Sequence, residues 1–189
     1  TPYQAKPETL AKLNYIVNDQ KRLLAGVITE LDENIGKVIQ ALKNNGVYDN
    51  TMIVFMGDNG PVGAGIRTGL KGRKGSIYEG GIRVPLYISW PNHYIPNTVY
   101  KSPVNNIDLY PTIINAIGGN VPATVRGINL TPYVTTNRAL VRNIFLAAPS
   151  AKGGFVRDGK WKLIYNVDGI QYQLFNLQQD PNETKNVAN

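Results

Sequence analysis

The sequence predicts an α/β fold over its first part, followed by a small antiparallel β-sheet. Three observations support this assignment. A helical apolar pattern at 21–44 leads to an apolar run at 51–56, and a Gly-rich loop at 57–81 follows that run. From about Ile144 onward, short alternating runs are separated by turn dipeptides. The helical pattern and the apolar run are typical of a helix that precedes a sheet strand, and the alternating runs with turn dipeptides are typical of β-hairpins.

The first expected element is a long amphipathic helix from about Lys21 to Asn44. Asn44-Asn45-Gly46 supplies its stop signal, because Asn and Gly tolerate the left-handed backbone that ends many helices. Residues 1–20 are predicted to be a lead-in. The apolar residues that recur on one helix face are Leu23, Val27, Leu31, Ile35, Val38 and Leu42.

The run from Thr51 to Met56 is apolar without alternation, which predicts a buried strand of a parallel sheet. Asp58 and Asn59 follow directly, at the carboxyl end of the strand, where open α/β sheets bind ligands. A carboxylate and an amide carbonyl offer the hard oxygen ligands that Ca²⁺ or Mg²⁺ takes. Asp-Asn-Gly is also typical of a turn, and by itself the run favours the turn.

Three further segments complete the predicted α/β part. Residues 57–81 form a long Gly-rich loop, and such loops in compact domains are usually functional. Residues 86–90 are predicted to return to the sheet. Residues 105–118 are predicted to be a short helix with Pro111 in its first turn and a stop at Gly118-Gly119.

The antiparallel sheet is predicted to follow a connection at 127–139. Its strands are expected at 154–157, 161–165 and 172–176. The turn signals between them are Asp158-Gly159 and Asp168-Gly169.

The loop also carries a basic motif, Leu-Lys-Gly-Arg-Lys-Gly-Ser-Ile-Tyr-Glu-Gly-Gly-Ile-Arg-Val-Pro, at 70–85. Placed after Asp-Asn-Gly in this order, it resembles the sulfatase family of the alkaline-phosphatase-like superfamily. The form Gly-Arg-Lys-x-Ser-x-x-Glu-Gly-Gly is most similar to the arylsulfatase B-like branch. Two more segments resemble family motifs: 24–36 is similar to the helix before the metal strand, and 174–184 to the late Leu-Tyr-Asn-Leu-x-x-Asp-Pro-x-Glu segment.

The resemblance implies the C-terminal part of an alkaline-phosphatase-like sulfatase fold. Residues 1–126 would belong to the catalytic α/β domain, and residues 127–189 would form a connection and a small antiparallel β subdomain. The implied activity is sulfuric ester hydrolysis of the arylsulfatase type, with formylglycine and Ca²⁺, or Mg²⁺ as the alternative cation. The implied partner is a sulfated small molecule or a sulfated glycan.

Three residues of this sequence match the family's functional positions. Asp58 and Asn59 match its later metal ligands, and Lys74 matches the lysine that contacts the sulfate oxygens. Lys71 and Arg73 are basic neighbours that could take the place of Lys74 in a shifted alignment. Lys74 is preferred because it precedes Tyr-Glu-Gly-Gly by the family's spacing.

Other parts of the family's site have no counterpart here. The sequence has no Cys and no Ser-x-Pro-x-Arg, so formylglycine is expected upstream. The paired early aspartates and the family's sulfate-binding His are also absent. We therefore expect the C-terminal portion of a longer sulfatase, which needs the missing N-terminal portion of the same protein and is inactive by itself.

Two alternatives remain open at this stage. A non-catalytic sulfatase-like matrix or carbohydrate-binding protein would keep the fold and lack the nucleophile. A phosphate or phosphonate ester hydrolase of the same superfamily is the weaker alternative, because the Gly-Arg-Lys and Glu-Gly-Gly pattern is of the sulfatase type.

Composition excludes several other classes. A hydrophobic content of 42% is that of a globular chain, and no apolar run approaches the ~20 residues of a membrane span. The net charge of +7 is mostly spread along the chain without a nucleic-acid fold motif, so we expect no nucleic-acid partner. Two glycosylation sequons, at Asn129 and Asn182, favour a secretory glycoprotein, lysosomal or extracellular, although Pro132 is expected to weaken the first.

Two residues near the motifs receive structural predictions. Glu79 could line the substrate mouth with Tyr78, but we favour a role in bracing the loop by pairing with Arg83. His93, the sole histidine, follows Trp-Pro-Asn in a predicted turn and is expected at the surface.

Overall fold

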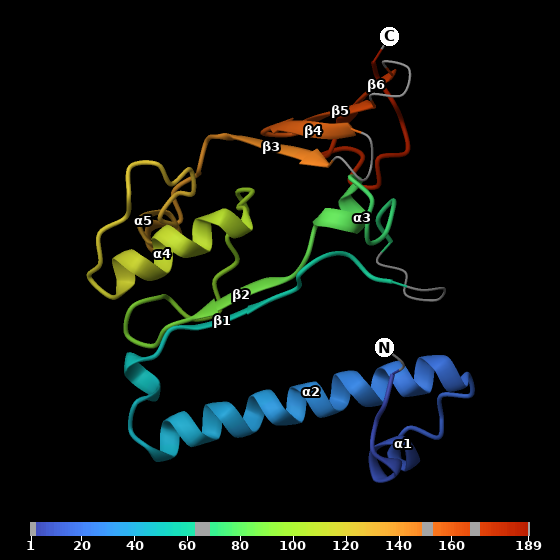
Figure 1. Cartoon of the computed structure of the whole chain (residues 1–189), viewed down its shortest axis with the longest axis vertical. Coiled ribbons are helices and arrows are strands. Elements are labelled where there is room, and N and C mark those ends of the chain that lie inside the picture. Colours follow the sequence, from blue (N-terminus) through green and yellow to red (C-terminus); the bar gives the residue numbers. More distant parts are fainter. Residues whose placement is uncertain (1–2, 63–68, 149–152, 167–170, 189) are drawn as a thin grey trace. The chain divides into compact units, whose positions relative to one another are not determined.

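The structure is a computed structural model that describes residues 3–62, 69–148, 153–166 and 171–188 (Figure 1). The chain divides into two compact units. The first unit consists of Thr1–Ile53 and Trp90–Asn92, and the second consists of Val54–Ser89 and His93–Asn189. The helices are α1 Pro7–Lys12, α2 Asp19–Asn44, η1 Tyr48–Asn50, α3 Glu79–Ile82, η2 Asn106–Asp108, α4 Leu109–Ala116 and α5 Thr131–Thr136. The strands are β1 Ile53–Met56, β2 Leu86–Ser89, β3 Asn143–Ala148, β4 Gly153–Asp158, β5 Trp161–Asn166 and β6 Gln171–Asn176.

The first unit is dominated by α2, and the predicted long helix is confirmed. It begins two residues earlier than expected because Asn18 caps it, with its side-chain oxygen 3.0 Å from the Lys21 amide nitrogen. Gly46, at φ 66°, follows its last turn as predicted. No helix in the described part of the chain is long and apolar enough to cross a membrane.

The lead-in is more ordered than predicted, because it contains α1. Pro7 at the first position and Glu8 in the first turn both favour helix initiation. α1 packs on α2 where Gly26 lies, and a Cβ at Gly26 would come within 2.8 Å of the Ala5 Cβ and 2.9 Å of Leu10 Cδ2. The glycine thus permits a close approach of the two segments.

β1 and β2 pair, so residues 86–90 return to the sheet as predicted. In Figure 1 the two strands run in opposite directions, so the parallel arrangement expected for β1 does not hold for this pair. The Gly57 amide donates to the Pro85 carbonyl at 3.1 Å, and the ring of Phe55 lies 6.2 Å from that of Tyr87. Gly57 is thus opposite Pro85 and Phe55 is opposite Tyr87, which is the register of an antiparallel pair. Phe55 is 42% exposed, because the described residues give β1 only one neighbouring strand.

The second unit contains the predicted antiparallel sheet, in the order β3-β4-β5-β6. Its register places Phe155 opposite Ile164, and Ile164 opposite Gln173. The turn at Asp158-Gly159 is confirmed, whereas the one predicted at Asp168-Gly169 lies outside the described residues. β3 was not predicted as a strand.

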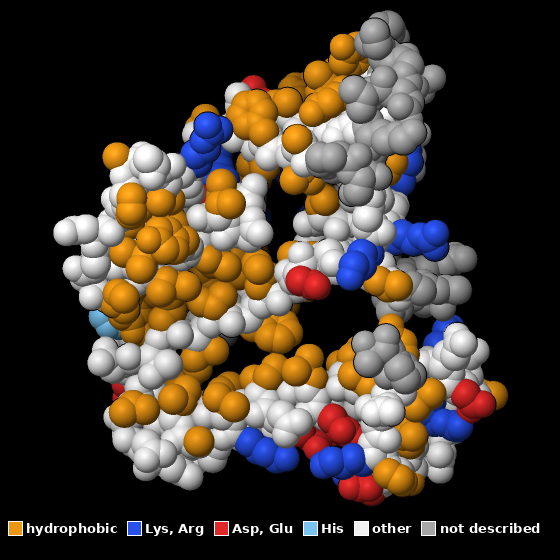
Figure 2. Space-filling view, viewed as in Figure 1, with side chains coloured by type: hydrophobic (Ala, Val, Ile, Leu, Met, Phe, Trp, Pro, Cys, Tyr) orange, Lys and Arg blue, Asp and Glu red, His pale blue; other side chains and the backbone are white. Residues whose placement is uncertain are grey.

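The predicted helix at 105–118 is confirmed as η2 followed by α4, with Pro111 in its first turn and Gly118 at φ 73° after its end. The predicted connection at 127–139 contains the short helix α5. Hydrophobic side chains gather over α4 on the face seen in Figure 2. The exposed apolar residues of η2, of α4 and directly after α4 are Ile107, Tyr110, Ile113 and Ile117.

One face of the β3–β6 sheet carries the main core of the second unit. It is covered by the segment around α3, which lies next to the sheet in Figure 1. The Tyr78 and Phe175 rings pack in an edge-to-face arrangement with their centroids 6.4 Å apart. The buried core residues are Ile77, Ile144, Phe155, Ile164, Phe175 and Leu177, with Tyr78 and Ile82 packed against them. The Gly-rich loop is thereby fixed to the sheet.

Asp108 should be a main determinant of stability around α4. Its fully buried carboxylate accepts from the Asn105 amide at 2.7 Å, the Ile128 amide at 2.9 Å and the Arg142 guanidinium at 2.6 Å. Asp108→Ala leaves these donors without their partner and should cost about 3–5 kcal/mol in chemical denaturation. Asp19→Ala, which removes an exposed ion pair with Arg22, is the control and should cost less than ~1 kcal/mol. Equal losses in the two variants would contradict this assignment.

Candidate functional site

Asp58 and Asn59 form a turn at the end of β1. Asp58 Oδ1 accepts from the Asn59 backbone amide at 2.8 Å and from the Asn59 side-chain Nδ2 at 3.0 Å. The chain does change direction at 58–60, but none of these residues has the positive φ that the turn interpretation invoked, and the bend leaves a ligand role open. The Asp58 carboxylate stays exposed at the end of the strand, with hard oxygens available to a cation.

The turn is held against α3 through Gly60. The Gly60 amide donates to the Gly81 carbonyl at 2.8 Å. A Cβ at position 60 would lie 1.9 Å from the Gly80 carbonyl oxygen, so only glycine allows this contact. This explains the glycines after Asp-Asn and in Glu-Gly-Gly, because two backbones must touch there.

A second backbone contact joins the same turn to the Lys74 loop. The Lys74 amide donates to the Pro61 carbonyl at 3.0 Å. Gly72 and Gly75, on either side of this residue, have φ values of 88° and 86°, a backbone conformation that glycine adopts without a steric penalty. The structure thus brings Lys74 and the Asp58-Asn59 turn, the predicted site residues, into one neighbourhood.

The basic residues of the loop differ in what their side chains contact. The Lys71 ammonium donates to the Glu183 carbonyl at 3.1 Å and lies 4.1 Å from the centre of the Tyr78 ring and 5.3 Å from that of Phe175. Lys74 is exposed, and its ammonium makes no ion pair or hydrogen bond with the described residues. Lys71 therefore serves the loop itself, whereas the Lys74 charge is available to an anion.

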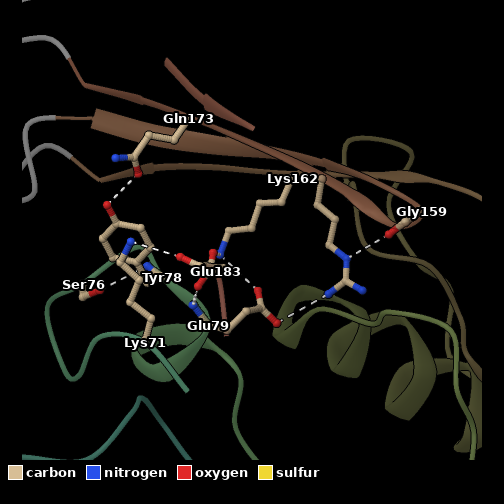
Figure 3. Close-up of polar contacts among 9 residues, drawn as sticks. Lys71, Ser76, Tyr78, Glu79, Gly159, Lys162, Gln173 and Glu183 are labelled. Carbon is tan, nitrogen blue, oxygen red and sulfur yellow. Dashed lines mark hydrogen bonds and ion pairs between the residues drawn. The ribbon is translucent and has the colours of Figure 1, made fainter. Parts of the chain in front are cut away.

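Glu79 braces the loop as predicted, but its partner is Lys162 of β5 and not Arg83 (Figure 3). The Lys162 ammonium lies 3.0 Å from Glu79 Oε1 and 2.8 Å from Glu183 Oε1, and it is fully buried. Arg157 lies 3.7 Å from the other Glu79 oxygen. Arg83 follows α3 in extended backbone and is exposed, so it does not reach the buried Glu79 carboxylate.

Glu183 completes this cluster of two acids and two bases. Its Oε2 accepts from the Glu79 backbone amide at 2.6 Å. Burial raises the pKa of Glu183, while the Lys162 ammonium and the Glu79 amide oppose the rise. Burial also lowers the pKa of Arg157, against the attraction of Glu79. The cluster joins α3, the sheet and the tail after β6.

A bound cation would find only a partial ligand set in this chain. The Asp58 carboxylate and the Asn59 amide fit the oxygen chemistry of Ca²⁺ or Mg²⁺. Over the described residues, no group of three or more His, Cys, Asp or Glu side chains is placed to hold a metal ion. Ca²⁺ takes six to eight ligands, so these two residues fit part of such a site.

Comparison with known proteins is consistent with this geometry. The family model described as Sulfatase matches residues 3–119, which contain the Asp58-Asn59 turn and the Lys74 loop. The chain belongs to the sulfatase family. A second sulfatase model, "N-sulphoglucosamine sulphohydrolase, C-terminal", matches residues 73–189, including the β3–β6 sheet and the tail.

Sulfatase relatives match most of this chain with only part of their own length. A sulfatase from Formosa agariphila is 30% identical over 86% of the chain and 34% of the relative. Arylsulfatase K from Xenopus laevis is 29% identical over 91% of the chain and 34% of the relative. The chain thus spans about a third of the length of these curated sulfatases.

A solved structure supports the fold along nearly the whole chain. The crystal structure of Ps i-CgsB matches with 35% identity and a TM-score of 0.87, covering 99% of this chain and 43% of that one. The predicted fold class, the C-terminal part of a sulfatase fold with a small antiparallel sheet, is confirmed. The domain boundary at 126/127 stays a prediction.

Sequence reasoning missed Lys162 and Glu183 as residues that organise the site. A lysine at 162 shares a sheet face with Ile164, which the alternation of β5 could have indicated. Glu183 was noted only as part of a family-like tail. His93 is exposed in a turn, as predicted.

Gly60 provides a direct test of the link between the two motifs. Gly60→Ala places a methyl group against the Gly80 carbonyl and should cost ~1–3 kcal/mol while the contact opens. We expect faster hydrogen exchange at the Gly60 and Lys74 amides. Gly36→Ala on α2, where no described atom lies within 4 Å of the new Cβ, should instead stabilise by ~0.5–1 kcal/mol. Unchanged exchange in Gly60→Ala would show that the link is not as described.

Proposed function

We propose that the complete protein is a sulfuric ester hydrolase of the arylsulfatase type, and that this chain supplies part of its site. One observation carries the proposal: the Gly60 and Lys74 backbone contacts hold the Asp58-Asn59 turn and a cationic loop in one place. Oxygen ligands on the turn and an exposed lysine on the loop joined to it suit a divalent cation and a sulfate group together.

Asp58 and Asn59 would hold Ca²⁺, or Mg²⁺, through their side-chain oxygens, with further ligands from the upstream polypeptide. When bound, the cation neutralises negative charge on the sulfate. The exposed Asp58 carboxylate and its hydrogen bond from the Asn59 amide support this assignment. Formylglycine, the expected nucleophile, would also come from upstream, because the sequence has no Cys or Ser-x-Pro-x-Arg.

Lys74 would bind the sulfate oxygens as charge builds on the transferring group. Its ammonium is a compact point charge on a flexible stem, and its backbone is fixed by Pro61. Fixing the backbone limits the region that the ammonium can reach, and a cation held near developing negative charge stabilises the transition state.

The proposed substrate class is a sulfated glycan or a sulfated small molecule. Ps i-CgsB, at 35% identity, is also known in complex with k-i-k-neocarrahexaose. A choline-sulfatase from Rhizobium meliloti is 31% identical over 91% of this chain, and this similarity supports a small sulfate ester as the alternative substrate. We further propose a secretory, lysosomal or extracellular location. Asn182 is exposed and is the better glycan acceptor, because Asn129 is half-buried and its side chain accepts from the Thr131 amide.

Phosphonate ester hydrolysis is the second candidate activity. A phosphonate monoester hydrolase from Silicibacter pomeroyi is similar, at 27% identity with a TM-score of 0.70. The arylsulfatase-like form of the 70–85 loop favours sulfate. Parallel assays with an aryl sulfate and an aryl phosphonate monoester decide between the two.

Lys74→Ala in the full-length protein should lower kcat for an aryl sulfate by ~10²–10³, because a transition-state charge contact is lost. The thermal unfolding midpoint should stay unchanged, since the Lys74 side chain is exposed. Lys37→Ala on α2 removes an equally exposed lysine and should leave kcat unchanged. Arg73→Ala should cost less than Lys74→Ala, and the opposite order would move the assignment to Arg73. Wild-type turnover in Lys74→Ala would refute the proposed role.

The 189-residue polypeptide by itself should not release a phenol from an aryl sulfate, because it holds a partial metal site and no formylglycine precursor. The full-length protein, assayed beside it at equal concentration, is the positive control. Turnover by the isolated polypeptide that survives further purification would contradict this expectation.

A further inference from the structure

The tail residue Glu183 makes more contacts to the Lys74 loop than its place in the sequence suggests. It is fully buried, and its backbone adopts φ 54°, which L residues other than Asn and Asp rarely do. Such conformations persist where the surroundings fix them, and they cluster at functional sites. Three of its oxygen atoms contact neighbours: the carbonyl, Oε1 and Oε2 (Figure 3).

These contacts hold the Lys74 loop at both ends. The Glu183 carbonyl accepts from the Lys71 ammonium at 3.1 Å, before Lys74. Its Oε2 accepts from the Glu79 amide at 2.6 Å, after Lys74. The Gly80 amide closes the loop on the Lys71 carbonyl at 2.7 Å. Glu183 therefore fixes Lys71 and Glu79, the two positions on either side of Lys74 in the loop.

The electrostatics of the cluster make this arrangement depend on the Glu183 charge. Lys162 is fully buried and lies between the Glu183 and Glu79 carboxylates. A buried ammonium needs matched negative charge, so removing one carboxylate alters the contacts of the other. Glu79 is the first residue of α3, whose Gly81 carbonyl holds the Asp58-Asn59 turn through Gly60. The effect of Glu183 thereby reaches both motifs of the site.

We propose that Glu183 is a positioning residue for sulfate binding, which sets the geometry of the Lys74 loop from the tail of the C-terminal subdomain. The inference rests on the proposed function for its link to catalysis. Glu183 does not touch the sulfate; it acts through Lys71, Glu79 and the backbone of α3.

The test compares three variants of the full-length protein. Glu183→Ala removes the side-chain contacts, and Glu183→Gln keeps an acceptor for the Glu79 amide while it removes the charge. Arg142→Gln is the matched control, because it also breaks a buried ion pair of the same unit, with Asp108, away from the loop. The readouts are kcat and KM for an aryl sulfate, calorimetric titration with inorganic sulfate, and hydrogen exchange over residues 70–83.

Glu183→Ala should lower kcat/KM by ~10²-fold, since small displacements of a reacting group have effects of that size. It should also weaken inorganic sulfate binding and speed exchange over the loop, with Glu183→Gln intermediate. Arg142→Gln should lose stability and keep kcat/KM, per folded molecule, within a factor of ~2. If Glu183→Ala does not fold, the same comparison is made with Glu183→Gln.

Equal changes in the Glu183 variants and Arg142→Gln, per folded molecule, would overturn the inference. Its failure is distinguishable from failure of the proposed function. A wild-type protein without sulfatase turnover would refute the function, whereas sulfate titration and loop exchange would still decide whether Glu183 positions the loop.

Discussion

The ammonium of Lys162, buried between two carboxylates, is the interaction on which the second unit depends. A lone buried charge is costly, and the cost is met only when its partners come close and are themselves satisfied. Glu79 comes from α3, Glu183 from the tail, and Lys162 from the middle of the sheet. The ion cluster therefore selects one arrangement of three segments, where apolar packing alone would accept several.

Gly60 connects the ion cluster to the candidate site, because its amide bonds to the Gly81 carbonyl of α3. Side chains fix α3 from the sheet, but backbone atoms alone join α3 to the turn after β1. At Gly60 the two segments of the chain approach more closely than any Cβ allows. The turn that carries the proposed metal ligands, Asp58 and Asn59, is thus held by a backbone contact with few degrees of freedom, and such rigidity is what a preorganised binding site needs.

Sequence reasoning found the elements whose information is local. The apolar periodicity of α2, the turn at Asp158-Gly159 and the Asp-Asn-Gly run all lie in short windows, and each was placed correctly. Direction and partner choice were not local. The β1–β2 pair runs antiparallel, with the Gly57 amide bonded to the Pro85 carbonyl, and Glu79 pairs with a lysine far along the chain. Motif order could locate Lys74, but it could not reveal that Glu183 holds its loop.

The distance along the chain between Glu183 and the Glu79 amide has a consequence for biosynthesis. Ribosomes synthesise a chain starting at its N-terminus, so a contact between distant residues forms only when both residues have emerged from the ribosome. β1, α3 and the Lys74 loop are made well before the tail that fixes them. During that interval Lys162 has at most one of its carboxylates. The Lys74 loop can therefore reach its final geometry only after synthesis has passed residue 183, so this part of the candidate site is completed late.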